Sequence, residues 1–271
     1  MGVIQSIIIG IVEGLTEFLP ISSTGHMIIT EKLLGLKEND FTTLFTVAIQ
    51  LGAILSVVVL YWKKFLAPIT IGGDRWKFYV KLIVAVIPAL FFGYLLSDKI
   101  DTLLESTTTV IIMMLLGGIV LVMIDNYFKN PTIEREDNIT FQKAFFIGLW
   151  QVIAMIPGVS RSAASIIGGM QQKLTRKLAA EFSFLLAVPT MLAATVYKIF
   201  KTYKIDPAIL KDHHNLMTLA VGNFVAFIVA ILAVRFFIGY LQKHGFRIFG
   251  YYRIVVGIIL LLMMIAGYLP R

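Results

Sequence analysis

The stretch EGLTEFLPISSTGH, residues 13–26, places two glutamates, a proline, two serines, a threonine and a histidine inside an apolar region of the chain. Polar and ionisable side chains are costly within a membrane and mark functional sites there. Pro20 ends a helix, because proline lacks the N–H group and its ring clashes with the preceding turn. Ser22, Ser23 or Thr24 can cap the helix that follows. The stretch therefore predicts two short helices joined by a polar turn.

The rest of the chain has the composition of an integral membrane protein. Of its 271 residues, 58% are hydrophobic and 15% are charged, and the mean hydropathy is +0.85. A soluble globular chain carries about 25% charged residues. The chain contains no cysteine, which excludes disulfide and thiol chemistry. The net charge of +8 is what lysines and arginines in cytoplasmic loops would give, and no motif supports a nucleotide or nucleic-acid site.

Six stretches are long and apolar enough to cross a membrane. They lie roughly at 44–62, 79–97, 107–124, 180–200, 216–241 and 250–269. Two other apolar regions, 1–35 and 140–172, are broken in the middle by PISSTG and PGVSRS. Each half of a broken region is short for a full span, so a re-entrant helical hairpin is the favoured interpretation. Two ordinary short spans are the alternative.

The order of one broken region and three spans occurs twice, which indicates an internal repeat. A shift of 137 residues carries Pro20 to Pro157 and Ser23 to Ser160. Because three spans is an odd number, the two halves would have opposite topology, which is a known way to build a site at the bilayer midplane. The predicted fold is one all-α polytopic membrane domain with an inverted repeat, each half a re-entrant hairpin plus three transmembrane helices. The domain covers residues 1–271, and the pseudo-repeats are 1–135 and 136–271.

The distribution of positive charge predicts the orientation. In this topology the segments 63–78, 129–143, 172–177 and 241–253 share one face and carry 4, 3, 3 and 3 lysines or arginines, 13 together, against 8 on the other face. Cytoplasmic loops carry an excess of lysine and arginine. We therefore expect the face with 13 to be cytoplasmic and both termini to lie outside.

Glu13 and Glu17 are four residues apart and share one face of the first short helix. Two ionised carboxylates this close repel each other, so one is protonated unless they share a cation. A divalent ion held by oxygen ligands and water would remove the repulsion. The alternative is a helix end in the headgroup zone with solvated glutamates. His26, a short distance beyond the break, can transfer protons or act as a nucleophile.

The second break, PGVSRSAAS at residues 157–165, supplies Ser160, Arg161 and Ser162 at another helix start, where free amides favour anions. An arginine in a membrane hairpin is costly unless it meets an anion, and its fork suits phosphate. The alternative is a salt bridge to one of the two glutamates of the first break. If the hairpins enter from opposite faces, their tips can meet. The combined set suits phosphoryl transfer with a metal.

Three other polar residues lie in apolar segments. Gln50 either lines the site or bridges helices. Glu181 is expected to have a structural partner, Arg176 or Lys177. Asn223 is expected to join two helices.

The motifs EGLTEFLPISSTGH and PGVSRSAAS, with AAEFSFLLAVP following, resemble the signatures of the bacterial undecaprenyl-diphosphate phosphatase family, UppP or BacA. The resemblance covers the whole chain in length and segment order. It implies removal of the terminal phosphate from undecaprenyl diphosphate, recycling of the cell-wall lipid carrier, and bacitracin resistance. It also implies a divalent cation, Mg²⁺ or Ca²⁺, and a plasma-membrane protein whose site opens to the outer side.

The family's functional residues are carried over by position. Its essential glutamates fall on Glu13 and Glu17, its serine and histidine on Ser23 and His26, and its second-motif residues on Ser160 and Arg161. Ala163 stands where the family pattern leads us to expect glycine. The hypothesis is that a metal on Glu13 and Glu17 clamps the diphosphate while Arg161 neutralises charge on the transferred group. Ser23 or His26 attacks or activates the nucleophile, or water attacks directly.

The remaining expectations concern substrate, partners and an alternative function. Ser22, Thr24, Ser160, Ser162, Arg161 and Gln50 are the predicted substrate-binding residues. The expected partners are a polyprenyl diphosphate and membrane lipids, without nucleic acid, and a homo-oligomer is left open. Because transporters also use inverted repeats with broken helices, the alternative function is an ion-coupled transporter or a lipid flippase.

Overall fold

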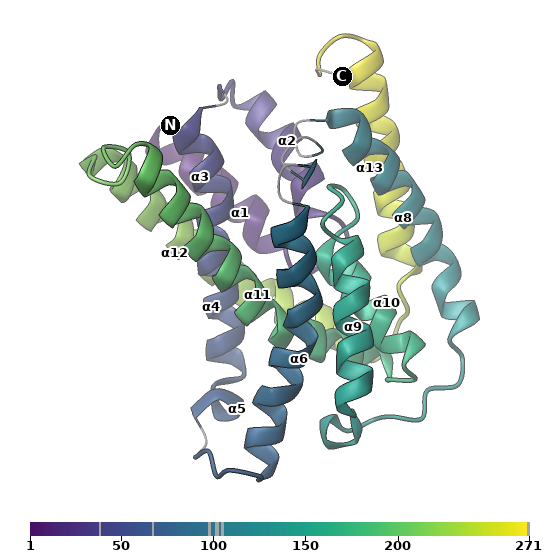
Figure 1. Ribbon diagram of the computed structural model, residues 1–271. Coiled ribbons are helices and arrows are strands. Elements are labelled where there is room, and N and C mark those ends of the chain that lie inside the picture. The colour runs from purple at the N-terminus through teal and green to yellow at the C-terminus, as the bar shows by residue number, and fades with distance from the viewer. Residues whose placement is uncertain (38, 67, 97–98, 101–102, 104–105, 270–271) are drawn as a thin grey trace.

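The computed structural model describes all of the chain except residues 38, 67, 97–98, 101–102, 104–105 and 270–271, and what it describes is helical (Figure 1). The helices are α1 Val3–Thr16, α2 Ser23–Leu33, α3 Asp40–Ala48, α4 Gln50–Leu60, α5 Trp62–Leu66, α6 Asp74–Leu95, α8 Thr107–Tyr127, α9 Phe141–Ile153, α10 Arg161–Gln171, α11 Arg176–Ile205, α12 His213–Leu241 and α13 Arg247–Ile265, with a 3₁₀ turn at Glu136–Asn138. A single bridge, between Ile133 and Leu174, is the only strand-like pairing in the described residues.

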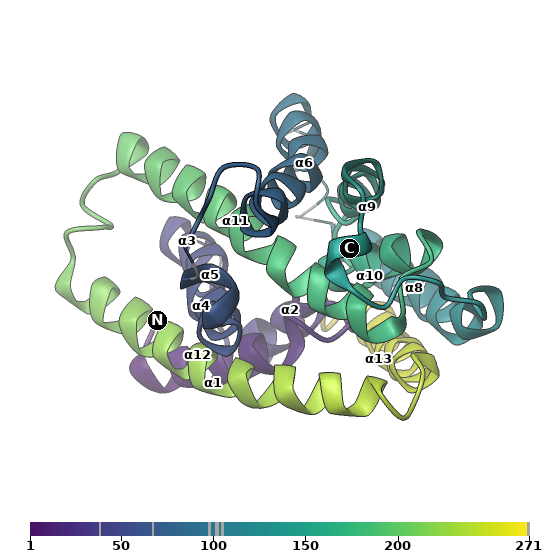
Figure 2. The ribbon, with the colours of Figure 1, turned by 90° about the horizontal axis from the view of Figure 1, so that it is seen from below.

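The six predicted spans are confirmed by length and composition. They are Asp40–Leu60, Asp74–Leu95, Thr107–Tyr127, Arg176–Ile205, His213–Leu241 and Arg247–Ile265. The chain is therefore a multi-pass membrane protein of all-α fold. Helix α11 has 30 residues, about 45 Å of helix against a hydrocarbon core of about 30 Å. It crosses the middle of the molecule obliquely, with α6 and α9 on one side and α1 and α12 on the other (Figure 2).

The first span contains a break that the sequence pattern did not indicate. Helices α3 and α4 are separated at Ile49, and the amide of Gly52 donates a 2.7 Å hydrogen bond to the Asn223 side-chain oxygen on α12. A polar side chain thus satisfies a backbone group that the break exposes, as membrane helices require. The expectation that Asn223 joins two helices is confirmed.

The two broken regions form helical pairs that enter from opposite ends of the molecule (Figure 1). The Met1 carbonyl oxygen lies 2.8 Å from a ring nitrogen of His214 at the start of α12, whereas Glu136, before α9, contacts Lys64 beside the α5–α6 connection. The helices have 14 and 11 residues in the first pair and 13 and 11 in the second. Since a full span needs about 20 residues, re-entrant hairpins fit these lengths and ordinary spans do not.

Each hairpin packs its first helix on a span of the other half, α1 on α12 and α9 on α6. Helices α1 and α12 approach closely at Gly10 and Gly14, where there is no room for a side chain. A Cβ at Gly10 would lie 2.8 Å from the Gly222 carbonyl oxygen, and one at Gly14 would lie 2.7 Å from that of Ala226. Small residues spaced by four are typical of such tight crossings in membranes. The exchange of partners is the pattern expected of two related halves, while the inverted repeat itself stays a prediction.

The repeat spacing differs by one residue from the predicted shift at the helix caps. Ser22 caps α2 and Ser160 caps α10, a separation of 138 positions rather than 137. The reason is the turn length: one residue separates Pro20 from its cap, whereas two separate Pro157 from its cap. Glycine at position 158, with φ of 93°, takes up the extra residue.

Candidate functional site

Both turns end in a serine whose backbone lies in the left-handed region. Ser22 has φ 71° and Ser160 has φ 77°. The Ser160 hydroxyl accepts a hydrogen bond from the amide of Ala163 at 3.3 Å, and that of Ser22 accepts from Gly25 at 3.5 Å. Positive φ is uncommon for residues other than glycine, and such strain gathers at functional sites. The two capped helices begin at the place where the hairpin tips meet.

Glu17 connects the two turns. One carboxylate oxygen accepts a 2.7 Å hydrogen bond from the Ser23 hydroxyl, and the other accepts a 2.9 Å bond from the Arg161 guanidinium. Both side chains of the ion pair are largely buried, with 6% of Glu17 and 13% of Arg161 exposed. The predicted meeting of the tips is confirmed, and so is the salt bridge that was considered as an alternative. Removing two charges from water is costly, so a buried ion pair is weak evidence for a stabilising role. It suits a site in which a ligand exchanges with one of the partners.

Arg161 has further partners that the motif did not reveal. It donates to the Ser183 carbonyl oxygen at 3.1 Å and approaches the Met191 sulfur at 3.4 Å. Its guanidinium lies 5.5 Å from the centroid of the Phe18 ring. The buried Nε has no hydrogen-bond partner among the described residues. One donor therefore stays available for an anion.

Glu13 lies one turn before Glu17 and is 1% exposed. One of its buried oxygens has no hydrogen-bond partner in the described part of the chain. An orphaned carboxylate oxygen beside a second carboxylate fits a shared cation. The described residues contain no group of three or more His, Cys, Asp or Glu side chains able to hold a metal. The protein would thus supply two carboxylates, which suits Mg²⁺ completed by water and substrate phosphates.

The second turn is tied to the first by hydroxyl groups. The Ser162 hydroxyl, which is fully buried, donates to the Leu19 carbonyl oxygen at 2.9 Å and lies 3.0 Å from the Ser160 hydroxyl. Behind them, the hydroxyls of Ser165 and Ser183 lie 2.6 Å apart. Of these contacts, the bond from Ser162 to Leu19 joins the two turns directly. The substrate-binding roles of Ser160 and Ser162 stay predictions.

His26 is bonded to groups other than the two carboxylates. Its Nδ1 lies 2.8 Å from the Ser22 carbonyl oxygen, and its Nε2 lies 2.7 Å from the Tyr252 hydroxyl. The two rings are stacked, with centroids 5.5 Å apart. Both ring nitrogens of His26 are thus engaged with partners other than Ser23. The sequence left Ser23, His26 and water open as the attacking or activating group. In the structure the Ser23 hydroxyl donates to the Glu17 carboxylate instead, a pairing that was not predicted from the sequence, while the imidazole is bonded to Ser22 and Tyr252.

The other predicted site residues are placed less decisively. Thr24 is half-buried on the first turn of α2, next to Ser23. Gln50 is half-buried at the start of α4, directly after the break at Ile49. Their roles in substrate binding stay predictions. Glu181 lies 3.9 Å from the Lys177 ammonium, which confirms its structural pairing.

The largest omission of the sequence-based prediction is Arg253. We assigned it to a cytoplasmic loop, but it is fully buried on α13. The correction leaves 12 rather than 13 basic residues on the face predicted to be cytoplasmic. Its guanidinium donates to five backbone carbonyl oxygens, those of Pro20, Met113, Met114, Gly158 and Val159. An arginine inside the apolar stretch 250–269 was the signal that could have identified it.

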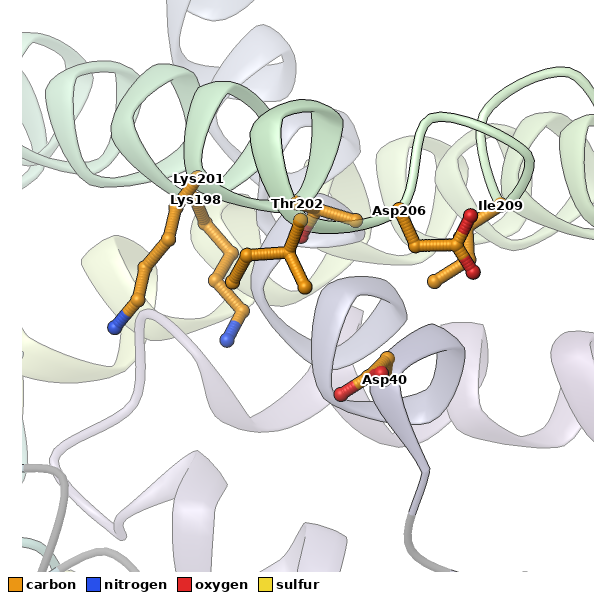
Figure 3. Close-up of a pocket in the computed structure, with 7 residues that line it drawn as sticks. Asp40, Lys198, Lys201, Thr202, Asp206 and Ile209 are labelled. Carbon is orange, nitrogen blue, oxygen red and sulfur yellow. The ribbon is translucent and has the colours of Figure 1, made fainter.

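Two surface hollows lie away from this cluster. One of about 40 Å³ lies between the start of α3 and the end of α11, where Figure 3 shows Thr202 and Asp206 above Asp40, with Lys198 and Lys201 to one side. The other, of about 510 Å³, is lined by residues around the start of α11 and the end of α12. They lie at opposite ends of α11, and the residues that line them belong to other parts of the chain than the two turns.

Comparison with known proteins gives consistent matches over nearly the whole chain. The family model described as bacitracin resistance protein BacA matches residues 6–259. The undecaprenyl-diphosphatase of Flavobacterium psychrophilum is 58% identical over 97% of this chain and 96% of its own length. That of Porphyromonas gingivalis is 49% identical over 98% of each chain, and that of Campylobacter jejuni is 42% identical over 98% of this chain and 96% of its own.

Proposed function

Because the chain belongs to the bacitracin resistance protein BacA family, we propose that it is an undecaprenyl-diphosphate phosphatase of the bacterial plasma membrane. It hydrolyses the lipid carrier diphosphate to undecaprenyl phosphate and inorganic phosphate, which returns the carrier to cell-wall synthesis and supports bacitracin resistance. The names of its relatives support this activity, and the comparisons contain nothing that favours a transporter or flippase.

The observation that carries the proposal is the chain of contacts from Ser23 through Glu17 to Arg161. A serine hydroxyl that donates a hydrogen bond to a carboxylate can lose its proton to that carboxylate and act as a nucleophile. A guanidinium held beside it by an ion pair is placed to bind the oxygens of a phosphoryl group. The three groups come from both hairpins of one copy, so a single chain contains a complete site. A homo-oligomer is not needed for the reaction.

The proposed reaction uses these groups in sequence. The diphosphate competes with Glu17 for Arg161, and the freed guanidinium binds the terminal phosphoryl oxygens. Glu17 accepts the Ser23 proton while the serine oxygen forms a bond to the terminal phosphorus. The bond from that phosphorus to the bridging oxygen breaks, and undecaprenyl phosphate leaves. Water then attacks the phosphorus of the phosphoserine, and the bond from that phosphorus to the Ser23 oxygen breaks. Glu17 returns its proton to the Ser23 oxygen, and inorganic phosphate leaves with the hydroxyl of the water, whose second proton goes to phosphate or solvent. His26 stays outside these steps.

We further propose that Glu13 and Glu17 hold a divalent cation, Mg²⁺ or Ca²⁺. The orphaned oxygen of Glu13 supports this assignment. When bound, such an ion neutralises charge on a diphosphate and on the leaving phosphate. The two carboxylates would hold the ion near the Ser23 hydroxyl, and Arg161 would oppose it from the second turn. Together they would place cationic groups on two sides of the terminal phosphoryl group.

The site is proposed to open towards the outer side of the membrane. The distribution of basic residues, 12 against 8 after the correction for Arg253, supports this orientation. Because the chain lacks cysteine, single substitutions Lys37→Cys and Lys243→Cys can be labelled in intact cells with an impermeant maleimide. Labelling of Lys37→Cys alone is expected. Labelling of Lys243→Cys alone would reverse the orientation.

The activity is tested by phosphate release from a C15 or C55 prenyl diphosphate in detergent, with Mg²⁺ and then with EDTA. We expect metal-dependent release by the wild type and its loss in Glu17→Gln and Arg161→Ala. A carrier would need a sealed membrane and would release no phosphate in detergent. Absence of release by folded wild-type protein with metal present would overturn the phosphatase assignment. Release that EDTA leaves unchanged would remove the metal from the proposal and keep the phosphatase.

A further inference from the structure

Arg253 binds the backbone of both hairpin turns at once. Its Nη1 donates to the carbonyl oxygens of Val159 at 2.9 Å and Pro20 at 3.4 Å, and its Nη2 donates to that of Gly158 at 2.7 Å. Nη2 also bonds the Met113 carbonyl at 2.9 Å, and Nε that of Met114 at 3.2 Å, both on α8. Each nitrogen of the guanidinium is therefore bonded to main chain, and three of the five acceptors belong to the two turns.

These bonds require a side chain with several N–H donors, whereas an apolar side chain would suffice for packing alone. Burying a guanidinium is costly unless all its donors are satisfied. Arg253 is 0% exposed, and the partners that its N–H groups bond are carbonyl dipoles rather than a carboxylate. Three of these carbonyls, those of Pro20, Gly158 and Val159, belong to turns outside the helices, where carbonyl groups lack helical partners. One rigid fork thus fixes the spacing between the turn that carries Glu17 and Ser23 and the turn that carries Arg161.

The preceding residue, Tyr252, fixes a third part of the site. The Ser22 carbonyl oxygen can only accept, so Nδ1 of His26 carries the proton. In the neutral imidazole, Nε2 then accepts from the Tyr252 hydroxyl, 2.7 Å away. The tyrosine is 43% exposed, so its hydroxyl contributes little to the packed core. It holds both the tautomer and the orientation of the histidine ring, which in turn is bonded to the cap residue of the first turn.

We propose that Tyr252 and Arg253 on α13 are positioning residues for the phosphoryl transfer: Arg253 sets the separation of the two turns, and Tyr252 locks His26 against the Ser22 carbonyl. This inference rests on the proposed function. Both residues act through the turn backbone and through His26, since their hydrogen bonds go to those groups. Helix α13 therefore supports the site together with the two hairpin turns, although it lies outside both sequence motifs.

The test of Arg253 is Arg253→Lys, which keeps the charge but offers donors from one nitrogen and cannot bond both turns and α8 together. Displacement of reacting groups by about 1 Å lowers catalysis on the order of 10²-fold. We expect kcat per folded protein to fall about a hundredfold while KM changes less than about threefold. The matched control is Arg247→Lys, on the first turn of the same helix, where the guanidinium bonds Asn126. It should retain wild-type kcat.

The test of Tyr252 is Tyr252→Phe, which keeps the ring stacked on His26 and removes the hydroxyl. Loss of the bond that holds His26 against the Ser22 carbonyl is expected to lower kcat about tenfold, less than the roughly 10²-fold of a 1 Å displacement, because it loosens the turn that carries Ser23 without removing a reacting group. The control is Tyr251→Phe, because Tyr251 is the adjacent tyrosine and is 57% exposed. In detergent, ¹⁵N spectra of histidine-labelled protein should show one His26 tautomer in the wild type and a mixture in Tyr252→Phe. A His26→Gln spectrum identifies the signals.

The outcomes separate this inference from the proposed function. If the wild type releases no phosphate, the phosphatase assignment fails, and the His26 spectra still decide whether Tyr252 is a positioning residue. If Arg253→Lys lowers the unfolding midpoint but leaves kcat per folded protein within twofold of wild type, Arg253 is only structural and the inference is overturned for it. Unchanged spectra and kcat in Tyr252→Phe overturn it for Tyr252. Should Arg253→Lys not fold, Tyr252→Phe against Tyr251→Phe decides alone.

Discussion

The two turns at the centre of the molecule end in the same backbone conformation but carry opposite charges. Ser22 and Ser160 both cap a helix from the left-handed region. The first turn is preceded by two carboxylates and followed by a hydroxyl, whereas the second is followed by the guanidinium of Arg161. Each turn thus offers free helix amides, and the side chains divide the remaining chemistry between them. Neither hairpin has a site without the other.

The largest expected effect comes from the groups that join the turns. Glu17→Gln and Arg161→Ala should each lower kcat/KM about 10³-fold, since an arginine that stabilises a transferring phosphoryl group contributes at least that much. The double variant should be little worse than either single one, because the residues act as a unit. Steady-state phosphate release measures all three. Glu181→Gln, at the ion pair with Lys177, is the control. Losses that multiply in the double variant would show that the turns act independently.

The next effect separates Ser23 from the backbone around it. Ser23→Ala should lower kcat on the order of 10²-fold or more, because it removes the proposed nucleophile. It should leave the unfolding midpoint unchanged, since the lost hydroxyl bonds only the Glu17 side chain among the bonds described. Acid quenching with ³²P-labelled substrate should trap phosphoserine in the wild type alone. Ser56→Ala, which removes a buried hydroxyl bonded to Ala53, serves as control. Activity retained in Ser23→Ala would shift the attack to water.

A smaller effect tests the extra residue in the second turn. Gly158→Ala should destabilise the protein by about 2–3 kcal/mol, because the new Cβ would collide with the Val110 carbonyl oxygen and the backbone has φ of 93°. Gly35→Ala, at φ 62° with no atom of the described residues within 4 Å of the new Cβ, should cost only about 1 kcal/mol. Unfolding in detergent measures both. Equal losses would mean that the contact with α8 contributes nothing.

The smallest effect compares the two caps directly. Replacing either serine by glycine removes the strain of a positive φ, which stabilises the fold by about 1 kcal/mol. The same change removes the capping side chain, which destabilises it by a few tenths of a kcal/mol. Ser22→Gly should therefore stabilise slightly, because its capping bond is long at 3.5 Å. Ser160→Gly also loses the 3.0 Å contact with Ser162 and should be near neutral. The two unfolding midpoints, measured side by side, check the order. A reversed order would show that the first cap is the stronger.

The parts of the site that the sequence predicted are those whose evidence is local. Glu17, Ser23 and Arg161 lie in polar runs within apolar helices, and the cost of charge in a membrane identifies them. Arg253 was assigned to a loop because it was counted with the segment 241–253, although its place in the apolar stretch 250–269 could have marked it as buried. Its partners are backbone carbonyls of both turns and α8, and a carbonyl has no residue type that a sequence could show. The spans follow from length and hydropathy for the same local reason.

The differences in detail have the same origin. The shift of 137 aligned the prolines but missed the longer second turn, since Ser23 and Ser160 share a residue type while Ser22 holds the equivalent cap. The break at Ile49 carries no proline or glycine of its own and depends on Asn223 of a distant helix. The length of the second turn and the break at Ile49 thus depend on tertiary contacts that the local sequence pattern does not show.

The close packing of α1 on α12 has a consequence for the biosynthesis of the protein. The Ser6 hydroxyl bonds the Thr218 carbonyl oxygen across 212 residues of chain, which a ribosome needs about 10 to 40 s to add. Helix α9, in contrast, emerges after α6, the helix on which it packs. The first hairpin is therefore synthesised early but can pack on α12 only late. We expect it to stay at the insertion machinery or the membrane surface until α12 has been synthesised.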